Sequence, residues 1–228
     1  MIVIRIPRIT YTNDETILEE TISIDEYEEI DYPYIEQSDI KDKLIKKIEK
    51  VIRGSYEYRE YRDYLREELD LNHCTLFTNL DFEEVNIEIH HGPLTLYDIT
   101  DIVLRKQMDK SINVTIWDVA EEVTKLHYQN RVGLAPLSVT IHDLLHEGDI
   151  FIPYQYFYGD WESFCKEYKD YFTDDQKKNL KHYIKLSNEV INDMKCPDIL
   201  QRKYTYMKIN GIELPKPISI DKKEKKTN

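Results

Sequence analysis

Apolar residues recur at helical spacing through much of the chain. Between Asp39 and Leu69 this spacing predicts one long helix, or two helices joined near Gly54. Two further helices are predicted within 98–128, because a Thr followed three residues later by Asp precedes an apolar stripe at both Thr95 and Thr115. The same spacing predicts two C-terminal helices, over 161–172 and 175–194.

Alternation of apolar and polar residues predicts short strands elsewhere. Residues 2–11 predict an edge strand, since proline is tolerated at a sheet edge. Residues 87–91 alternate into a His-His pair and stop at Gly-Pro, which predicts a strand that ends abruptly. We expect this strand to form a hairpin with 74–79, and a further strand over 149–158. The predicted fold class is therefore α+β, mostly helical with short edge strands.

Four of the seven histidines lie in two short windows of the sequence. His90 and His91 end the predicted strand. His142 and His146 lie four residues apart in a short predicted helix that ends at Gly148, so their rings would share one face. A strand-end pair and a helical pair together outline a metal site, although either pair alone is more often structural. The other histidines are expected to be ordinary residues without special partners: His73, His127 and His182.

Composition limits the classes of function. With 228 residues, 33% of them charged, the chain has the composition of a soluble globular protein. A net charge of −13 argues against non-specific wrapping of nucleic acid, so any such contact must be local. Three cysteines without a CxxC pair indicate a reducing cytoplasm. No apolar run approaches about 18 residues, so we expect no membrane partner.

Two charged stretches each leave two interpretations open. Residues 9–40 contain eleven Asp or Glu and no Lys or Arg, which is typical of a solvated acidic segment or of an acidic arm that binds a partner. Arg53, Arg59, Arg62 and Arg66 alternate with tyrosines along the predicted helix. This pattern is typical of a nucleic-acid groove or of a solvated, salt-bridged helix face.

The segment 72–148 contains a three-part pattern around the histidine windows. Its parts are Cys74-Thr-Leu-Phe, then Glu88-Ile-His90-His91-Gly-Pro, then Gly-Leu-Ala-Pro-Leu-Ser-Val-Thr-Ile-His142-Asp-Leu-Leu-His146. The pattern resembles the HNH nucleases of the His-Me finger superfamily, with the helices of 98–128 as an insertion. The resemblance implies a ββα-metal core in which two strands and a helix hold one divalent ion.

The same resemblance implies a role for each histidine of the two windows. His91 would be the general base that activates water, and His90 and His142 would bind the metal, with His146 as a further ligand. The implied cofactor is Mg²⁺ or Mn²⁺, with Zn²⁺ or Ni²⁺ as alternatives, and the implied substrate is DNA. A metal that neutralises the leaving oxygen and a base that takes a proton from water together address the stability of a phosphodiester.

The sequence departs from the family pattern at two places. Many members clamp a structural zinc with two CxxC knuckles, and the corresponding positions here hold Cys74, Phe77, Ser138 and Ile141. No structural zinc is expected, and apolar packing by Phe77 and Ile141 would replace it. The central Asn that orients the base in the family aligns with Gly133, and the nearest candidate is Asn130, three residues away.

The whole chain also resembles uncharacterised proteins of large bacteriophages, which implies the cytoplasm of an infected bacterium as its location. The predicted organisation has four parts: an N-terminal strand and acidic segment (1–38), a long helical region (39–70), the HNH-like core with its insertion (71–160), and C-terminal helices with a basic tail (161–228).

Three functions are compatible with these features. The first is a phage-encoded, metal-dependent endonuclease that hydrolyses DNA. The second is a catalytically inactive interaction protein that uses the finger fold and the acidic surface to bind a host or phage protein. The third is a structural component of the virion, for which the eighteen tyrosines are the indication.

Overall fold

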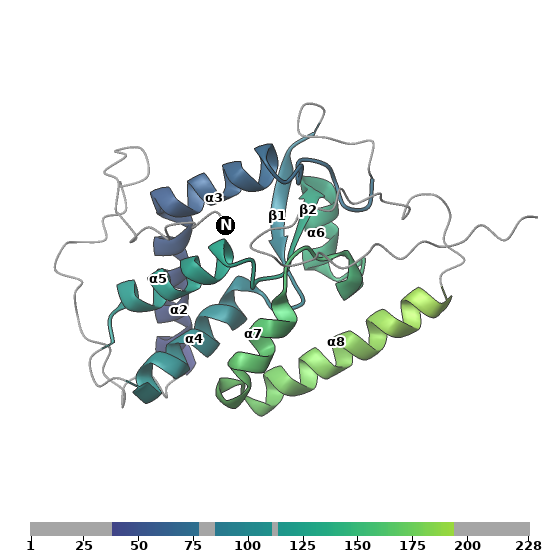
Figure 1. Ribbon diagram of the computed structural model, residues 1–228. Coiled ribbons are helices and arrows are strands. Elements are labelled where there is room, and N and C mark those ends of the chain that lie inside the picture. Colours follow the sequence, from purple (N-terminus) through teal and green to yellow (C-terminus); the bar gives the residue numbers. More distant parts are fainter. Residues whose placement is uncertain (1–37, 78–84, 111–113, 194–228) are drawn as a thin grey trace, which may run out of the picture.

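The computed structural model describes residues 38–77, 85–110 and 114–193 (Figure 1). Within these ranges the protein has seven α-helices, two short 3₁₀ helices and one two-stranded antiparallel sheet. This is the mostly helical α+β class that the sequence predicts. The predicted N-terminal strand, nearly all of the acidic segment and the basic tail lie outside the described residues.

Four helices form a layer on one side of the sheet (Figure 1). They are α2 (Ser38–Gly54), α3 (Tyr56–Glu67), α4 (Leu96–Lys110) and α5 (Ile116–Tyr128). A break at Ser55, whose side chain accepts a hydrogen bond from the Tyr58 amide at 3.1 Å, separates α2 from α3 and confirms the two-helix interpretation. Thr95 and Thr115 accept hydrogen bonds from the amides three residues later, so both predicted capping patterns begin helices.

The sheet pairs β1 (Ile87–His91) with β2 (Leu134–Ser138) in antiparallel register. Residues 74–77 do not form the predicted hairpin with β1, because β1 pairs with β2 across an insertion of two helices, and residues 78–79 of that prediction lie outside the described residues. All five residues of β2 are buried, so this strand lacks the alternation that marks a half-buried strand in a sequence. Thr75 contacts β2 instead, donating its amide to the Pro136 carbonyl at 2.7 Å.

Helix α6 (Val139–Glu147) follows β2 without a loop. It ends at Gly148, whose φ of 82° lies in the left-handed region that favours glycine. This confirms the short helix predicted to hold His142 and His146. Strand, strand and helix therefore follow one another in the order β1, β2, α6, with α4 and α5 inserted between the strands.

The predicted strand over 149–158 was also wrong. The segment is irregular, contains the 3₁₀ helix η1 (Tyr154–Tyr156), and touches the sheet through a single bridge between Leu134 and Tyr158. Pro153 precedes η1 and Gly159 follows the bridge with a φ of 106°, so extended pairing cannot continue in either direction. The chain then forms α7 (Trp161–Glu167), η2 (Lys169–Tyr171) and α8 (Asp174–Asp193).

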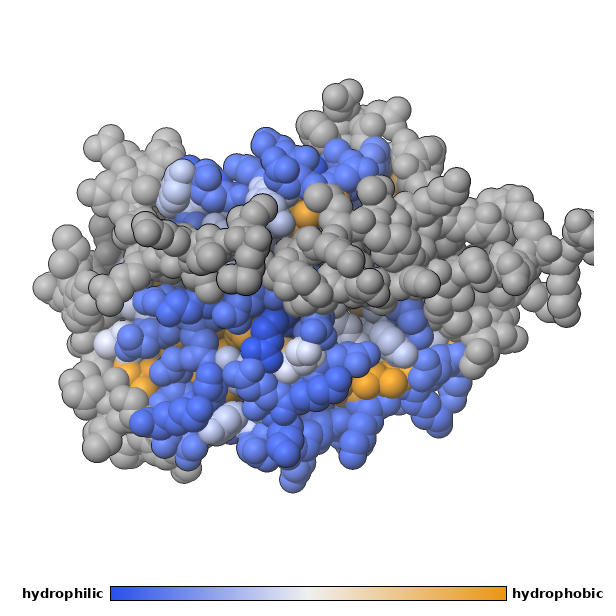
Figure 2. Space-filling model, viewed as in Figure 1, coloured by the Kyte–Doolittle hydropathy of each residue, from blue (hydrophilic) through white to orange (hydrophobic). Residues whose placement is uncertain are grey.

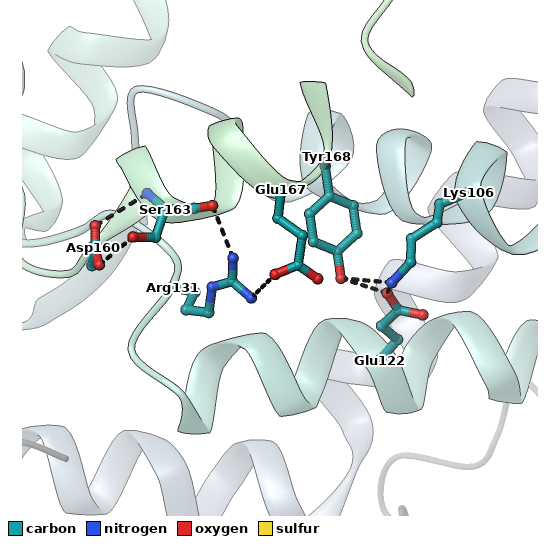
Figure 3. Close-up of polar contacts among 7 residues, drawn as sticks. All are labelled: Lys106, Glu122, Arg131, Asp160, Ser163, Glu167 and Tyr168. Atoms are coloured by element: carbon teal, nitrogen blue, oxygen red, sulfur yellow. Dashed lines mark hydrogen bonds and ion pairs between the residues drawn. The ribbon is translucent and has the colours of Figure 1, made fainter. Parts of the chain in front are cut away.

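Polar contacts join α7 to the helical layer (Figure 3). Lys106 on α4 forms an ion pair with Glu122 on α5 and contacts the Tyr168 hydroxyl after α7. Arg131, which follows α5, forms an ion pair with Glu167 and donates to a carbonyl of α7. These contacts connect α7 and the residue that follows it to α4, to α5 and to the segment after α5.

The buried side chains form two hydrophobic clusters. The larger one fills the space among the helices and includes Ile48, Leu65 and Ile102. The smaller one lies around the sheet and α6 and includes Leu137 and Phe157. The surface in Figure 2 is mainly hydrophilic, with apolar residues in small separate patches. Among the described residues, no helix is both long and apolar enough to span a membrane.

Candidate metal centre

Three histidines from two elements converge at one edge of the sheet. His90 comes from β1, and His142 and His146 come from α6. One ring nitrogen of each lies within 4.8 Å of the others, and the Nε2 atoms of His142 and His146 are 3.2 Å apart. Metal–nitrogen bonds of about 2.0–2.1 Å place two ligands of one ion about 3 Å apart. The spacing therefore fits a single metal ion after a small movement of the His90 ring.

The local sequence explains why these three side chains meet. His142 and His146 lie one helical turn apart, so both rings project from one face of α6. In the sheet, His90 stands opposite Ala135, whose methyl group leaves room for the imidazole. Because α6 begins directly after Ser138, which pairs with Ile87, its first turn lies beside the beginning of β1.

Glu88 orients one of the three rings. Its Oε2 lies 3.1 Å from Nδ1 of His142. A neutral His142 therefore donates Nδ1–H to the carboxylate and leaves the lone pair on Nε2, the atom nearest His146. Glu88 and His90 are two residues apart in β1, so they share one face of the strand. A carboxylate behind a ligand histidine is the usual support of a metal centre.

The surroundings favour the unprotonated form of two of these imidazoles, His90 and His142. Burial, followed by the neighbouring His142 and His146, lowers the pKa of His90 to about 4. Burial and then His146 lower the pKa of His142, against the opposing effect of Glu88. Metals bind the neutral form of histidine. His146 is exposed, so the cluster is open to solvent on that side.

A cavity of about 530 Å³ adjoins the histidine cluster. Its lining includes Arg53 from α2 and Arg62 and Arg66 from α3. In the part of the chain that the structure describes, none of these three guanidinium groups forms an ion pair with a carboxylate. The salt-bridged face, one of the two interpretations of the arginine row, is therefore not formed at these three residues within the described part of the chain, and the nucleic-acid groove stays a prediction. Arg59 does not line the cavity.

His91 lies in the core, on the opposite face of β1 from His90. It borders the cavity but is only 5% exposed, and its Nε2 is 2.9 Å from Nε2 of His127. Nδ1 of His127 lies 2.7 Å from the Val123 carbonyl and must donate to it, so Nε2 of a neutral His127 accepts from Nε2–H of His91. Burial holds the pKa of His91 well below its ordinary value. The role of His91 as a base stays a prediction, and this placement weighs against it.

His127 is the residue whose importance the sequence analysis missed. Predicted to have no partner, it is 1% exposed and contacts His91, Tyr58 and Tyr61. Its only signal in the sequence is its place on the apolar face of α5, four residues after Val123.

The two candidates for the orienting Asn do not take that role. Asn130 is buried, and its side-chain atoms have no hydrogen-bond partner among the described residues. At Gly133 a Cβ atom would lie 1.8 Å from the Gly92 carbonyl oxygen, because the two backbones meet there. The space that a side chain at this position would need is filled by the turn after β1. In this chain the group that contacts His91 is His127.

The structure brings together only some of the four residues at the positions of the zinc-binding CxxC pairs, which are Cys74, Phe77, Ser138 and Ile141. Cys74 and Ile141 are buried in the smaller hydrophobic cluster, and the Cys74 sulfur lies 3.9 Å from the Ser138 hydroxyl. Phe77 is 37% exposed, so the prediction that it packs in place of a zinc clamp was wrong. The packing expected of Ile141 is confirmed.

Comparison with known protein families identifies a family for this chain. A family model described as bacteriophage G278-like virion protein matches residues 2–213. No curated protein and no solved structure matches the chain. Phage origin is thereby supported, while nothing in the comparisons indicates the HNH nuclease superfamily. Because the match covers most of its length, the chain belongs to the bacteriophage G278-like virion protein family.

Proposed function

We propose that this phage protein is a metal-dependent endonuclease of the HNH type that hydrolyses DNA phosphodiesters. The observation that carries the proposal is the convergence of His90, His142 and His146 beside a cavity that three arginines line. The order of strand, strand and helix, with ligands at the end of the first strand and on the helix, agrees with what the HNH resemblance implies. The host cytoplasm is the proposed place of action.

The donor set narrows the choice of metal. Three imidazole nitrogens suit Zn²⁺, Ni²⁺ and related transition metals, whereas Mg²⁺ prefers oxygen ligands and keeps several waters. We therefore favour Zn²⁺ or Ni²⁺ over the Mg²⁺ and Mn²⁺ that the family resemblance implies. Three protein ligands with one solvent-exposed side leave a coordination position for water or substrate.

The proposed chemistry follows from these groups. A bound divalent ion would polarise a phosphoryl oxygen and make a water acidic enough to attack near neutral pH. Arg53 and Arg62 would reduce the negative charge that repels the nucleophile. Glu88 would hold His142 in the tautomer that presents Nε2. No histidine base is required in this scheme, so we assign His91 a positioning role through its bond to His127.

Plasmid nicking tests the proposal. Untagged wild-type protein, His142→Ala and the control His182→Ala would be incubated with supercoiled plasmid and Zn²⁺, Ni²⁺, Co²⁺, Mn²⁺ or Mg²⁺ in turn. His182 is exposed on α8 and lies outside the cluster. We expect the wild type and His182→Ala to nick equally and His142→Ala to lose nicking. Absence of nicking by the wild type with every ion, or undiminished nicking by His142→Ala, would contradict the proposal.

The variant His91→Gln separates positioning from base catalysis. Glutamine can still donate a hydrogen bond to His127 but cannot take a proton from water. If His91 only positions β1, nicking and metal affinity both persist in this variant. If His91 is the base, nicking disappears while metal affinity is unchanged.

A second candidate function is favoured by the family match. Members are described as virion proteins, so the chain would be a particle component or an interaction protein without catalysis. Gly133 in place of the orienting Asn agrees with that function. The proposed contact surface is the acidic segment 9–40, of which only the last residues are described.

Two measurements distinguish this candidate from the endonuclease. A pull-down from host and phage lysates, with and without residues 9–37, should lose its partner on deletion if the acidic segment is the contact. The endonuclease hypothesis predicts that plasmid nicking does not depend on that segment. If the protein without residues 9–37 still captures the same partner, the hypothesis that the acidic segment is the contact surface is contradicted.

A further inference from the structure

The arginines beside the candidate metal centre are held in place, and none of them forms an ion pair at 4.0 Å or less with a carboxylate of the described residues. The Arg53 charge does act on Glu49, where it opposes the rise that burial causes in the pKa of that carboxyl. Arg62 and Arg66 lie one turn apart on α3, so they share a helix face, and Arg53 lies in the last turn of α2. Arg66 donates to the Ile87 carbonyl at 3.2 Å, which links it to the strand that carries His90. The Arg62 guanidinium lies 5.9 Å from the ring centroid of Tyr58.

Donor atoms of two of these arginines are buried without a partner. The Nε atoms of Arg62 and Arg66 are shielded from solvent and have no hydrogen-bond acceptor among the described residues. A buried guanidinium N–H without an acceptor is costly, and an anionic oxygen is the acceptor that matches its planar fork best. Arg62 and Arg66 therefore line the cavity with guanidinium groups whose hydrogen-bonding capacity the described residues leave partly unused.

Three basic residues elsewhere in the protein do have a carboxylate partner. Lys41, Lys106 and Arg131 each form an ion pair with a carboxylate at 4.0 Å or less. In a chain with a net charge of −13, three arginines that line one cavity are a local concentration of positive charge. Two carboxylates also line the cavity, Glu49 and Glu88, and Glu88 already contacts His142.

We propose that Arg53, Arg62 and Arg66 form a phosphate-binding subsite that holds a phosphate group of a nucleic-acid strand beside the metal centre. The inference rests on the proposed function for the identity of the strand, but phosphate binding itself requires no metal. Tyr58 beneath Arg62 is only 4% exposed, so its ring offers no surface on which a base could stack. Binding at this subsite therefore depends on the phosphate backbone and is independent of base sequence.

Binding without metal tests the subsite. The affinity of the full chain for a short fluorescein-labelled DNA duplex would be measured by fluorescence anisotropy in EDTA over a series of salt concentrations. We expect Arg53→Gln/Arg62→Gln to weaken binding about tenfold at low salt and to reduce the salt slope by roughly 0.9 per lost phosphate contact. Arg66 is left intact because of its bond to Ile87.

The matched control removes the same charge elsewhere. Lys178 and Lys181 are exposed on α8 and do not line the cavity, so Lys178→Gln/Lys181→Gln should bind like the wild type. Thermal unfolding shows whether each variant is folded. If the double arginine variant is unfolded, the single variant Arg53→Gln replaces it, because Arg53 is exposed. Equal weakening by the arginine and lysine variants, or no weakening by either, overturns the subsite.

Two further measurements are needed. One separates failure of the endonuclease from failure of the subsite, and the other identifies which phosphate group of the DNA is bound. Nicking is measured on the same proteins with metal present, so absence of nicking together with arginine-dependent binding in EDTA contradicts the endonuclease alone. Duplexes with and without a 5′-phosphate distinguish a terminal phosphate from an internal diester. The subsite is supported if either duplex binds more weakly to the arginine variant than to the wild type. It is overturned if both duplexes bind equally to the variant and the wild type.

Discussion

His90 and His91 are neighbours in one strand, yet they have opposite environments. His90 is half-buried at the open cluster with His142 and His146, whereas His91 is enclosed in the core with His127. Successive side chains of a strand project to opposite faces, so β1 sends one imidazole to each side. The same residue type thus serves a solvent-open centre and a buried hydrogen-bonded pair within two positions.

The difference between the two histidine groups lies in the contacts of each ring. In the open cluster, two imidazole nitrogens approach each other at 3.2 Å and a carboxylate supports one ring from behind. In the buried pair, a backbone carbonyl fixes the tautomer of His127, and no carboxylate contact to either ring is found among the described residues. Both groups contain a contact between two Nε2 atoms, but the one between His142 and His146 is exposed, so a cation from solvent can replace the proton there, whereas the one between His91 and His127 is enclosed in the core. Changes to the buried pair should therefore affect stability, and changes to the open cluster should affect metal binding.

The largest effect on stability is expected from His127→Ala. This change leaves a cavity among Tyr58 and Tyr61 and removes the acceptor of His91 Nε2–H. We expect the free energy of unfolding to fall by about 2–4 kcal/mol. Urea denaturation measures this, with His182→Ala as the control that changes stability by less than about 0.5 kcal/mol. Zn²⁺ affinity should stay the same, and a large loss of affinity would show that the two histidine groups are not separate.

Acid should destabilise the protein through the same buried pair. Burial lowers the pKa of His127 from 6.5 to about 4, so the unfolded chain takes up a proton that the folded chain refuses between these values. The contribution of His127 to the free energy of unfolding is therefore fully present above about pH 6.5 and declines as the pH falls toward 4. The total loss is about 2–3 kcal/mol. Carboxylates also titrate in this window, so the informative quantity is the difference between wild type and His127→Gln. Parallel stability curves for the two proteins would contradict the assignment.

The smallest effect is expected from Glu88→Gln. Loss of the charge behind His142 should reduce Zn²⁺ affinity about tenfold, as is usual when a group supporting a ligand is changed. The free energy of unfolding without metal should change by less than about 0.5 kcal/mol, because Glu88 is exposed. Isothermal titration calorimetry gives the affinity, with the exposed Asp175→Asn as a charge-matched control. An affinity equal to that of the control would remove Glu88 from the metal centre.

The local features of this fold were predictable from the sequence. The break near Gly54, the helices that begin at Thr95 and Thr115, and the helix that ends at Gly148 all depend on residues close together in the chain. The shared face of His142 and His146 follows from the same short-range geometry. Such features are determined by caps, turns and periodicity, which a sequence displays directly.

Contacts between distant segments were not predictable in the same way. The partner of β1 lies more than forty residues away, and β2 is too buried to show alternation. His127 meets His91 only because the last turn of α5 lies beside the end of β1, and no pattern in α5 marks that contact. The placement of Arg62 beside the histidines depends likewise on how α3 packs near β1. Each of these results depends on tertiary packing, which overrides local preferences.

Cobalt binding tests the central claim most directly, namely that His90, His142 and His146 hold one metal ion. Untagged protein would be titrated with Co²⁺ and followed by visible absorption, for the wild type, the three single alanine variants of these residues, and His182→Ala. We predict one Co²⁺ per chain in the wild type and in His182→Ala, and loss of that binding in each of the three variants. Absence of Co²⁺ binding by the wild type, or undiminished binding by the cluster variants, would contradict the account.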